Sequence, residues 1–317
     1  MEYRLLGRTG IRVSRMCFGV LTIGPLQANL GLAQGAALIQ KAFEVGVNFL
    51  DTAELYRTYP YIRRALREHG NRDRIVVASK SYAYTRSGMR KSVERARRGM
   101  GLDTVDLFLL HEQESALTLR GHRPALEYLV ECRDKGLVRA VGVSTHCAAV
   151  VWAAAEMEEI DVIHPVINYT GLGIRDAGIK EMLAAVRTAH QRGKGIYAMK
   201  PLGGGNLVRE ARRALEFVRD LPYVDSVAVG VRTEDEVVYD ALILGGGEVD
   251  PALACKVAGC EKRLLVETWC RGCGRCVKVC PAGALHLEGG RPVVDQEKCV
   301  LCGYCGAACN EFCIRIV

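Results

Sequence analysis

The sequence predicts an α/β protein in which a closed (β/α)8 TIM barrel precedes a small, cysteine-rich α+β domain. Apolar strand-like runs alternate with helix-like runs, and the alternation repeats eight times within about 250 residues, the usual length of such a barrel. The crowding of cysteines near the carboxyl terminus sets the second domain apart. We expect the barrel over residues 1–249, a helical linker over 250–265 and the cysteine-rich domain over 266–317.

An open, doubly wound sheet is the alternative arrangement for alternating strands and helices. It is disfavoured because no Gly-x-Gly-x-x-Gly pattern follows the first strand. A hairpin over residues 3–16, with Gly7 and Gly10 at its turn, is expected before the barrel. The barrel strands are predicted within residues 13–20, 47–52, 74–80, 105–111, 138–144, 161–168, 195–202 and 224–231. The helices are predicted at about residues 31–46, 61–69, 87–100, 124–135, 147–158, 178–192, 207–219 and 233–244.

Three successive strands of this barrel end in polar side chains, namely Asp51, Lys80 and His111. Tyr56 follows shortly after Asp51. The carboxyl ends of parallel strands meet at one mouth of a barrel, so we expect these four side chains to converge there. Taken singly, each has an ordinary explanation, such as an ion pair or an aromatic residue at the rim. Their combination on successive strand ends indicates a catalytic site.

In the contexts NFLDTAELY, VVASK and LFLLH, these residues resemble the catalytic tetrad of the aldo-keto reductase family. The resemblance covers about residues 1–245 and implies NADP- or NAD-dependent reduction of an aldehyde or ketone, or the reverse oxidation of an alcohol. Tyr56 is then the proton donor, Lys80 lowers the pKa of the phenol, and Asp51 holds the ammonium charged and oriented. A neutral His111 is expected to hydrogen-bond the carbonyl oxygen of the substrate.

The same resemblance implies that a dinucleotide lies across the barrel mouth. Ser144 matches a family residue that bonds the nicotinamide carboxamide, and Asn168 lies in the region of another, near His164. The segment MKPLGGGN matches the loop that spans the cofactor, which predicts contacts from Lys200, Pro201, Leu202, Gly203, Gly204 and Gly205. Three glycines allow a pyrophosphate to approach the backbone closely, although a flexible loop is the alternative explanation.

The segment GVRTEDEVVYD departs from the family pattern. Many members place an Arg that binds the 2′-phosphate of NADPH where this chain has Glu236, and a Glu-Asn pair where it has Tyr239 and Asp240. A carboxylate would repel that phosphate, but Arg232 or Lys200 would compensate. Arg232 is therefore a further predicted cofactor contact, and the choice between NADPH and NADH stays open.

Two copies of the spacing C-x2-C-x2-C-x3-C lie near the carboxyl terminus. They resemble a bacterial ferredoxin with two 4Fe-4S clusters, in which the fourth Cys of each copy serves the other cluster. The predicted ligands are Cys270, Cys273, Cys276 and Cys309 for one cluster and Cys299, Cys302, Cys305 and Cys280 for the other. Zinc or disulfide bonds are disfavoured because zinc sites use CxxC pairs and four ligands in total. A hairpin is expected over residues 284–295, and residues 313–317 are expected to pair with 263–267.

Six cysteines lie outside this spacing and are interpreted as ordinary buried or linker thiols: Cys17, Cys132, Cys147, Cys255, Cys260 and Cys313. Fourteen cysteines without an amino-terminal signal core favour metal binding in a reducing compartment, so we expect a cytoplasmic protein. No run approaches the roughly 18 apolar residues that span a membrane.

The formal net charge of +7 invites a nucleic-acid interpretation. Each four-iron cluster with four thiolates carries about −2, however, and two of them leave only a mildly basic balance. The Arg-rich residues 95–101 are expected to form a solvated helix face. We therefore expect no nucleic-acid partner.

The two halves of the chain would transfer electrons differently, because a hydride carries two electrons and a 4Fe-4S cluster passes one. A carbonyl reductase with an attached electron-transfer module is favoured because the tetrad is complete. In a second interpretation, a flavin in the barrel or on a partner links the two kinds of transfer. In a third, the barrel docks a redox protein partner and the clusters carry the activity. The expected substrate is a small carbonyl compound or alcohol, with Tyr59, Tyr61, Tyr82 and Tyr84 as candidates for an aromatic pocket.

Overall fold

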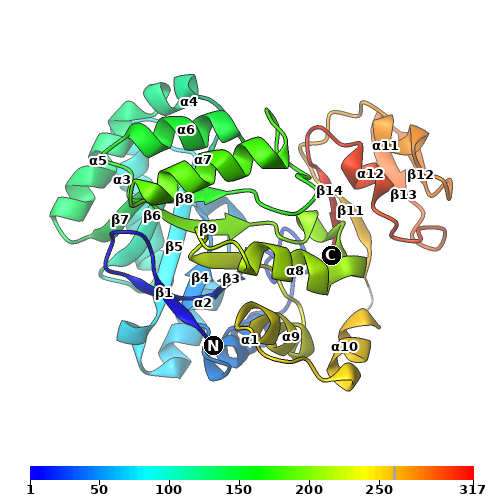
Figure 1. The fold of residues 1–317 in the computed structure, drawn as a ribbon, viewed down its shortest axis with the longest axis horizontal. Coiled ribbons are helices and arrows are strands. Elements are labelled where there is room, and N and C mark those ends of the chain that lie inside the picture. The colour runs from blue at the N-terminus through cyan, green and yellow to red at the C-terminus, as the bar shows by residue number, and fades with distance from the viewer. Residues whose placement is uncertain (260–261) are drawn as a thin grey trace.

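Eight parallel strands form a closed barrel in the structure, a computed structural model that describes residues 1–259 and 262–317 (Figure 1). The barrel strands are β3 (Met16–Gly19), β4 (Phe49–Asp51), β5 (Val76–Ser81), β6 (Val105–Gln113), β7 (Val138–Thr145), β8 (Val162–Pro165), β9 (Gly195–Met199) and β10 (Ser226–Val229). They are hydrogen-bonded in chain order, and β10 pairs with β3 to close the ring. The predicted barrel is confirmed, and the open sheet is not observed.

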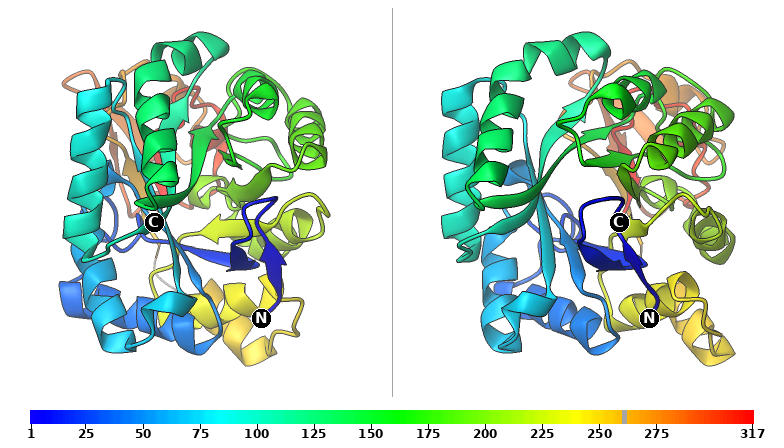
Figure 2. Two further views of the ribbon diagram at one scale, coloured as in Figure 1. Left: turned by 90° about the vertical axis from the view of Figure 1, so that its left-hand side faces the viewer. Right: turned by 60° about the vertical axis from the view of Figure 1, so that its left-hand side comes forward.

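Helices surround the barrel on its outside (Figure 2). They are α1 (Leu32–Glu44), α2 (Tyr59–His69), α3 (Arg86–Met100), α4 (Ala116–Gly121), α5 (Arg123–Asp134), α6 (Ala148–Glu156), α7 (Ile179–Gln191), α8 (Ala211–Arg219), α9 (Glu234–Leu244) and α10 (Pro251–Ala258). In the part of the chain that the structure describes, four 3-10 turns lie in connections between strands and helices: η1 (Glu54–Tyr56), η2 (Arg72–Arg74), η3 (Gly203–Gly205) and η4 (Val208–Glu210). Helix α4 was not predicted, and α8 begins later than predicted because η4 occupies the start of the segment 207–219. In the described residues, every helix is too short or too polar to cross a lipid bilayer.

Local capping explains where several helices begin. The Thr85 side chain accepts a hydrogen bond from the Gly88 amide at 3.1 Å and starts α3. The Ser115 and Thr118 side chains form a reciprocal capping box that starts α4. The Arg-rich stretch lies on α3, where Arg97 Nη1 pairs with Glu94 at 2.7 Å and Arg95 pairs with Glu54. This stretch is therefore a helix face bearing ion pairs.

Two apolar layers hold the barrel together. One lies between the strands and the surrounding helices, and the other fills the inside of the ring. The hairpin of β1 (Tyr3–Leu5) and β2 (Arg12–Ser14) adds Leu6, Ile11 and Val13 to the inner layer. It therefore closes the amino-terminal end of the barrel, and the carboxyl ends of the strands face the opposite opening.

The carboxyl-terminal domain consists of two small sheets and two short helices. Its elements are β11 (Leu264–Val266), α11 (Arg275–Lys278), β12 (Leu285–Glu288), β13 (Arg291–Val294), α12 (Tyr304–Ala307) and β14 (Ile314–Ile316). Both predicted pairings are confirmed, since β12 and β13 form a hairpin and β11 pairs antiparallel with β14. Strand β11 begins inside the stretch predicted as linker, and Cys260 lies outside the described residues.

Strand β14 packs against η3 at the barrel mouth (Figure 1). The Asn206 side chain donates to the Ile314 carbonyl at 3.3 Å, and Arg209 donates to the Val300 carbonyl. The two segments approach so closely that a Cβ on Gly205 would overlap the Ile316 carbonyl, and one on Gly306 would overlap the Asn206 side chain. The carboxyl-terminal domain therefore covers part of the opening at which the strands end.

Candidate active site at the barrel mouth

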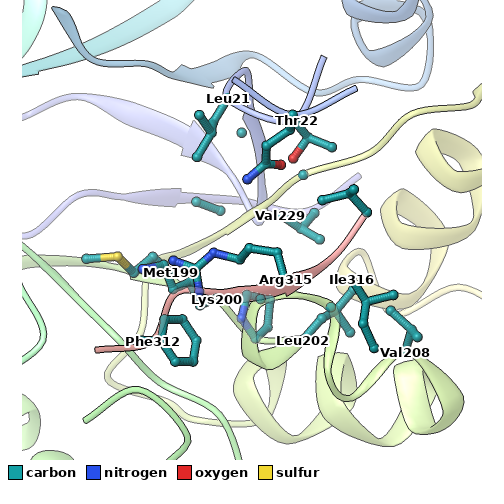
Figure 3. Close-up of a pocket in the computed structure, with 18 of the residues that line it drawn as sticks. Leu21, Thr22, Met199, Lys200, Leu202, Val208, Val229, Phe312, Arg315 and Ile316 are labelled. Atoms are coloured by element: carbon teal, nitrogen blue, oxygen red, sulfur yellow. The ribbon is translucent and has the colours of Figure 1, made fainter. Parts of the chain in front are cut away.

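A cavity of about 1320 Å³ opens at the carboxyl ends of the barrel strands. Asp51, Tyr56, Lys80 and His111 line it, so the structure brings the four predicted side chains together. Side chains of the carboxyl-terminal domain line the same cavity, among them Phe312, Arg315 and Ile316 (Figure 3). The site is thus shared between the barrel and the domain that covers it.

Asp51 and Lys80 form a buried ion pair at the base of this cavity. Lys80 Nζ donates to both carboxylate oxygens of Asp51 at 2.6 Å and to the Thr52 carbonyl at 2.8 Å. The exposed fractions are only 1% for Lys80 and 6% for Asp51. Since all three ammonium protons are used, the lysine is fixed in position.

Tyr197 and His164 support this ion pair, a role that the sequence does not predict for either residue. The Tyr197 hydroxyl donates to Asp51 Oδ1 at 3.0 Å. The His164 ring stacks on the Tyr197 ring with a centroid distance of 3.8 Å. Both residues lie within predicted strands, but nothing in the local sequence indicates which strand residues meet across the inside of a barrel.

Tyr56 and His111 face each other above the ion pair. The Tyr56 hydroxyl lies 3.3 Å from His111 Nε2, and the rings meet edge to face. The Tyr82 ring stacks on the other side of His111 at 4.2 Å, and its hydroxyl donates to Glu112 Oε2 at 2.6 Å. Tyr82 thus lines the cavity as expected, whereas Tyr59 and Tyr61 are buried in the layer under the helices.

Burial sets the protonation of both residues. Removal from water lowers the pKa of His111 well below its ordinary value, and the nearby Lys80 and Lys200 lower it further. His111 is therefore neutral, as expected. Burial also raises the pKa of Tyr56 well above its ordinary value, and the Asp51 carboxylate raises it further.

This direction is opposite to the predicted lowering of the Tyr56 pKa by Lys80. The largest cause is burial of the phenol, whereas Lys80 is paired with Asp51 and holds its nitrogen 5.3 Å from the Tyr56 ring centroid. Arg315, from β14, is the cation that acts to lower the Tyr56 pKa. The Tyr56 phenol is therefore protonated in the resting site, which is the form a proton donor needs.

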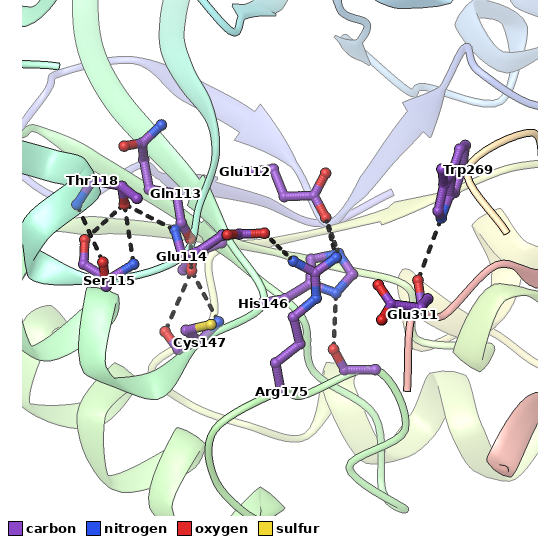
Figure 4. A network of polar contacts seen from close by, with 12 residues as sticks. Glu112, Gln113, Glu114, Ser115, Thr118, His146, Cys147, Arg175, Trp269 and Glu311 are labelled. Atoms are coloured by element: carbon purple, nitrogen blue, oxygen red, sulfur yellow. Dashed lines mark hydrogen bonds and ion pairs between the residues drawn. The ribbon is translucent and has the colours of Figure 1, made fainter. Parts of the chain in front are cut away.

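A second polar network lies at the edge of the cavity (Figure 4). Arg175 bonds Glu112 at 3.0 Å and Glu114 at 2.6 Å. His146 Nδ1 contacts the Gly173 carbonyl at 2.8 Å, and Trp269 donates to the Glu311 carbonyl at 3.3 Å. The carboxylate of Glu112 is thus already bound by Arg175 and Tyr82.

The cavity fits a dinucleotide in size and in the residues that surround it. All the residues predicted to contact the cofactor line it, except Asn168 and Gly203. Ser144 Oγ accepts from the Glu112 amide at 2.8 Å, and the Asn168 amide group donates to the Leu172 carbonyl at 2.8 Å. These cofactor contacts stay predictions.

Strand β14 of the same chain packs closely against the glycine loop, at the place where a pyrophosphate was expected to approach. An added Cβ on Gly204 would lie 3.0 Å from Arg315 Nη1, and one on Gly205 would overlap the Ile316 carbonyl. Both glycines have positive φ angles, 66° and 88°, which favour glycine. The loop is therefore shaped at least in part by its packing against β14.

Glu236 is engaged within the protein. Its carboxylate accepts from the Arg232 amide at 2.7 Å and pairs with Lys262 Nζ at 3.3 Å. Lys262 lies just before β11, so the segment after α10 neutralises the carboxylate that departs from the family pattern. The expected repulsion of a 2′-phosphate is reduced accordingly.

The predicted cluster ligands lie in the carboxyl-terminal domain, but among the described residues no three Cys, His, Asp or Glu side chains are grouped closely enough to hold a metal ion. Cys280, Cys299, Cys302 and Cys305 line one small cavity. In the other set, burial raises the pKa of the Cys276 thiol, and the neighbouring Cys270, Cys309 and Cys273 raise it further. The residues present fit two four-iron clusters by their donor chemistry, because such clusters are held by Cys thiolates. The assignment of individual ligands stays a prediction.

The fold and the mouth define a TIM-barrel protein with a polar site at the strand ends and an attached cysteine-rich domain. Residues 15–237 match the aldo/keto reductase family, and the chain belongs to that family. Residues 263–310 match the 4Fe-4S dicluster domain. The chain is thus an aldo-keto reductase family oxidoreductase with an iron–sulfur domain.

The relatives share the barrel at low sequence identity. L-galactose dehydrogenase of Arabidopsis thaliana is 22% identical over 220 residues, which cover 66% of this chain and 68% of that protein. A probable voltage-gated potassium channel subunit beta of Oryza sativa subsp. japonica is 26% identical over 249 residues, covering 70% and 73%.

Solved structures show the same fold. A putative aldo-keto reductase from Pseudomonas aeruginosa superposes with a TM-score of 0.65 at 24% identity, over 77% of this chain and 94% of that one. An aldo-keto reductase from Bacillus halodurans in its holo form gives a TM-score of 0.65 at 19% identity, over 81% and 95%.

Proposed function

We propose that this protein reduces an aldehyde or ketone with NADPH or NADH at the Tyr56 site, or oxidises the corresponding alcohol in reverse. The observation that carries this proposal is the pair formed by a protonated Tyr56 hydroxyl and a neutral His111 Nε2, 3.3 Å apart in the cavity. The buried Asp51–Lys80 pair lies beside them.

A bound nicotinamide dinucleotide would supply the hydride that goes to the carbonyl carbon. Ser144, Asn168, Arg232 and the loop from Lys200 to Gly205 are proposed to hold it. Tyr56 gives its proton to the carbonyl oxygen, and His111 Nε2 orients that oxygen beside the phenol. Asp51 and Lys80 hold the tyrosine's surroundings fixed, since both are buried and bonded to each other.

A second candidate function is electron transfer through the clusters to a carrier in the cavity, either a flavin or a redox protein partner. Trp269 and Phe312 favour it, because both line the cavity and lie within three residues of the predicted ligands Cys270 and Cys309. A relative named as a potassium channel subunit also fits a barrel that works within an assembly.

Replacement of Tyr56 by Phe tests the first proposal. We expect kcat/KM for aldehydes with NADPH or NADH to fall by about 10² to 10⁴, the usual contribution of a positioned acid. Cluster absorbance and iron content should be unchanged. Tyr84→Phe is the matched control because Tyr84 is 64% exposed. Turnover that survives Tyr56→Phe would exclude Tyr56 as the proton donor.

The absorbance spectrum of anaerobically purified protein tests the second candidate. Under the first proposal we expect about eight irons per chain and no flavin absorbance. Bound flavin that is reduced by the clusters would favour the second candidate.

A further inference from the structure

Two cationic side chains enter the cavity from different domains. Lys200 comes from the loop after β9, and Arg315 comes from β14 of the carboxyl-terminal domain. In Figure 3 the Arg315 side chain extends from β14 toward Met199 and Lys200. Arg315 is only 6% exposed, and its Nη1 has no hydrogen-bond partner among the described residues.

The residues around Arg315 do not balance its charge closely. Its nearest carboxylate is that of Glu267, with Oε1 at 3.7 Å from Nε, which is an ion-pair distance and too long for a hydrogen bond. Its guanidinium carbon lies 4.2 Å from the centroid of the Phe312 ring. A cation over an aromatic ring is stabilised, but its hydrogen-bond donors are not satisfied in this way.

Lys200 faces the same ring, and no carboxylate of the described residues forms an ion pair with it. Its Nζ lies 4.8 Å from the Phe312 centroid and 2.7 Å from His146 Nε2. Burial lowers the pKa of His146 well below its ordinary value, so this imidazole is neutral and offers Lys200 no charge. The Glu112 carboxylate is engaged by Arg175 and Tyr82. Lys200 also adopts a positive φ of 58°, which is uncommon for a lysine.

Burial of two neighbouring cations is unfavourable unless an anion lies between or beside them. Burial lowers the pKa of both Lys200 and Arg315, and the charge of Arg315 lowers that of Lys200 further. An oxyanion bound by both would supply the missing charge and accept the free guanidinium protons.

We propose that Arg315 and Lys200 form an oxyanion site inside the catalytic cavity. The oxyanion is either the carboxylate of a carbonyl substrate or a phosphate of the dinucleotide. The first source follows from the cavity that Arg315 and Lys200 share with Tyr56, and the second from the proximity of Arg315 Nη1 to Gly204. The substrate part of this inference rests on the proposed function; the binding of an anion does not.

The site would give the iron–sulfur domain a direct part in ligand binding by the barrel. Arg315 lies in the strand that pairs with β11, so its place depends on the folding of that domain. A ligand with an oxyanion would therefore contact both domains at once.

Calorimetric titration of the anaerobic, cluster-loaded protein tests the site without turnover. The Tyr56→Phe protein serves as background, and Arg315→Gln is added to remove the charge. The probes are inorganic phosphate, phenylglyoxylate, its uncharged methyl ester, NADPH and NADH. We expect Arg315→Gln to weaken phosphate binding by about tenfold or more, a factor that corresponds to the loss of a charge-assisted bond.

The remaining probes separate the two sources. If Arg315→Gln weakens the binding of phenylglyoxylate but not that of the methyl ester or of either dinucleotide, the oxyanion is a substrate carboxylate. If Arg315→Gln weakens the binding of NADPH and NADH equally, the oxyanion is a phosphate that both dinucleotides share. Anion binding that is absent from the Tyr56→Phe protein, or unchanged by Arg315→Gln, overturns the proposal. If the protein does not reduce carbonyl compounds, the proposed function is wrong, but these titrations still measure whether the anion site exists.

Two further variants control for folding. Arg212→Gln removes an arginine that lines the same cavity, but Arg212 is exposed and paired with Glu216 at 2.9 Å, so anion affinity should not change. Lys200→Asn removes the second cation from the barrel side, at a backbone conformation that asparagine tolerates. Lys200→Asn should weaken the binding of the same probes as Arg315→Gln. Because Lys200 lies in the barrel, this result does not depend on whether Arg315→Gln disturbs β14.

Discussion

The barrel and the carboxyl-terminal domain fill their interiors in different ways. The barrel has a continuous apolar layer on each side of its ring of strands. The core of the smaller domain consists of Leu264, Leu285, Ile314 and Ile316 together with two predicted cluster ligands, Cys276 and Cys305. The difference indicates that the barrel is stabilised by its own side chains, whereas the small domain needs its clusters to complete a core.

Removal of iron should have the largest effect on stability, and it should affect the carboxyl-terminal domain but not the barrel. Under anaerobic chelation, residues 263–317 should lose their structure and become open to proteases, while the barrel keeps its circular dichroism and cooperative melting. Limited proteolysis with mass spectrometry measures both. Cys276→Ser should act in the same way, and Cys255→Ser, at an exposed cysteine outside the motifs, should not. A domain that resists proteolysis without iron would contradict the comparison.

Lys80→Met should be the next largest change, and it should affect the barrel alone. It leaves the buried Asp51 carboxylate with the Tyr197 hydroxyl as its remaining bond. Breaking a buried ion pair on one side costs about 3–5 kcal/mol in the free energy of unfolding. Urea denaturation measures the loss, while cluster absorbance monitors the other domain. The double change Asp51→Asn with Lys80→Met should recover part of the stability, and an unaltered free energy for the single variant would speak against the buried pair.

Acidification should give a smaller effect, again in the barrel. Burial lowers the pKa of His164 to about 4 from an ordinary value of 6.5. The unfolded chain therefore takes up the proton first, so this contribution to stability is complete above pH 6.5 and is lost as the pH falls toward 4. The loss from this residue is roughly 3 kcal/mol over that window. Unfolding free energies of the unmutated and His164→Gln proteins between pH 7 and 4 measure it, and parallel curves would refute it.

The sequence predicted the barrel and its polar mouth because both depend on local periodicity. Asp51, Lys80 and His111 each end an apolar run, and the geometry of a parallel barrel brings such ends together. Contacts across the inside of the ring were not predictable in this way. Tyr197 reaches Asp51 from a strand 146 residues away, and no local pattern marks that pair.

The sequence also did not predict that the carboxyl-terminal domain contributes side chains to the cavity. Residues 313–317 were predicted correctly as a strand that pairs with 263–267, but a pairing prediction says nothing about which side chains leave the sheet. Arg315 enters the cavity because β14 packs against η3, and that packing depends on glycines in both regions. The pKa of Tyr56 also differs in direction from the prediction, because burial raises it and the lysine expected to lower it is paired with Asp51.

The glycines at this junction limit how freely the two parts could be exchanged. Gly205 meets the Ile316 carbonyl, and Asn206 lies against Gly303 and Gly306, with no room for a Cβ at Gly205 or Gly306. A ferredoxin-type domain grafted from another protein would pack on this barrel only if it also lacked side chains at the positions of Gly303 and Gly306. The two domains therefore fit each other specifically at this junction, although the sequence alone suggests two independent modules. A substitution on one side of the junction is tolerated only if the other side still leaves room for it.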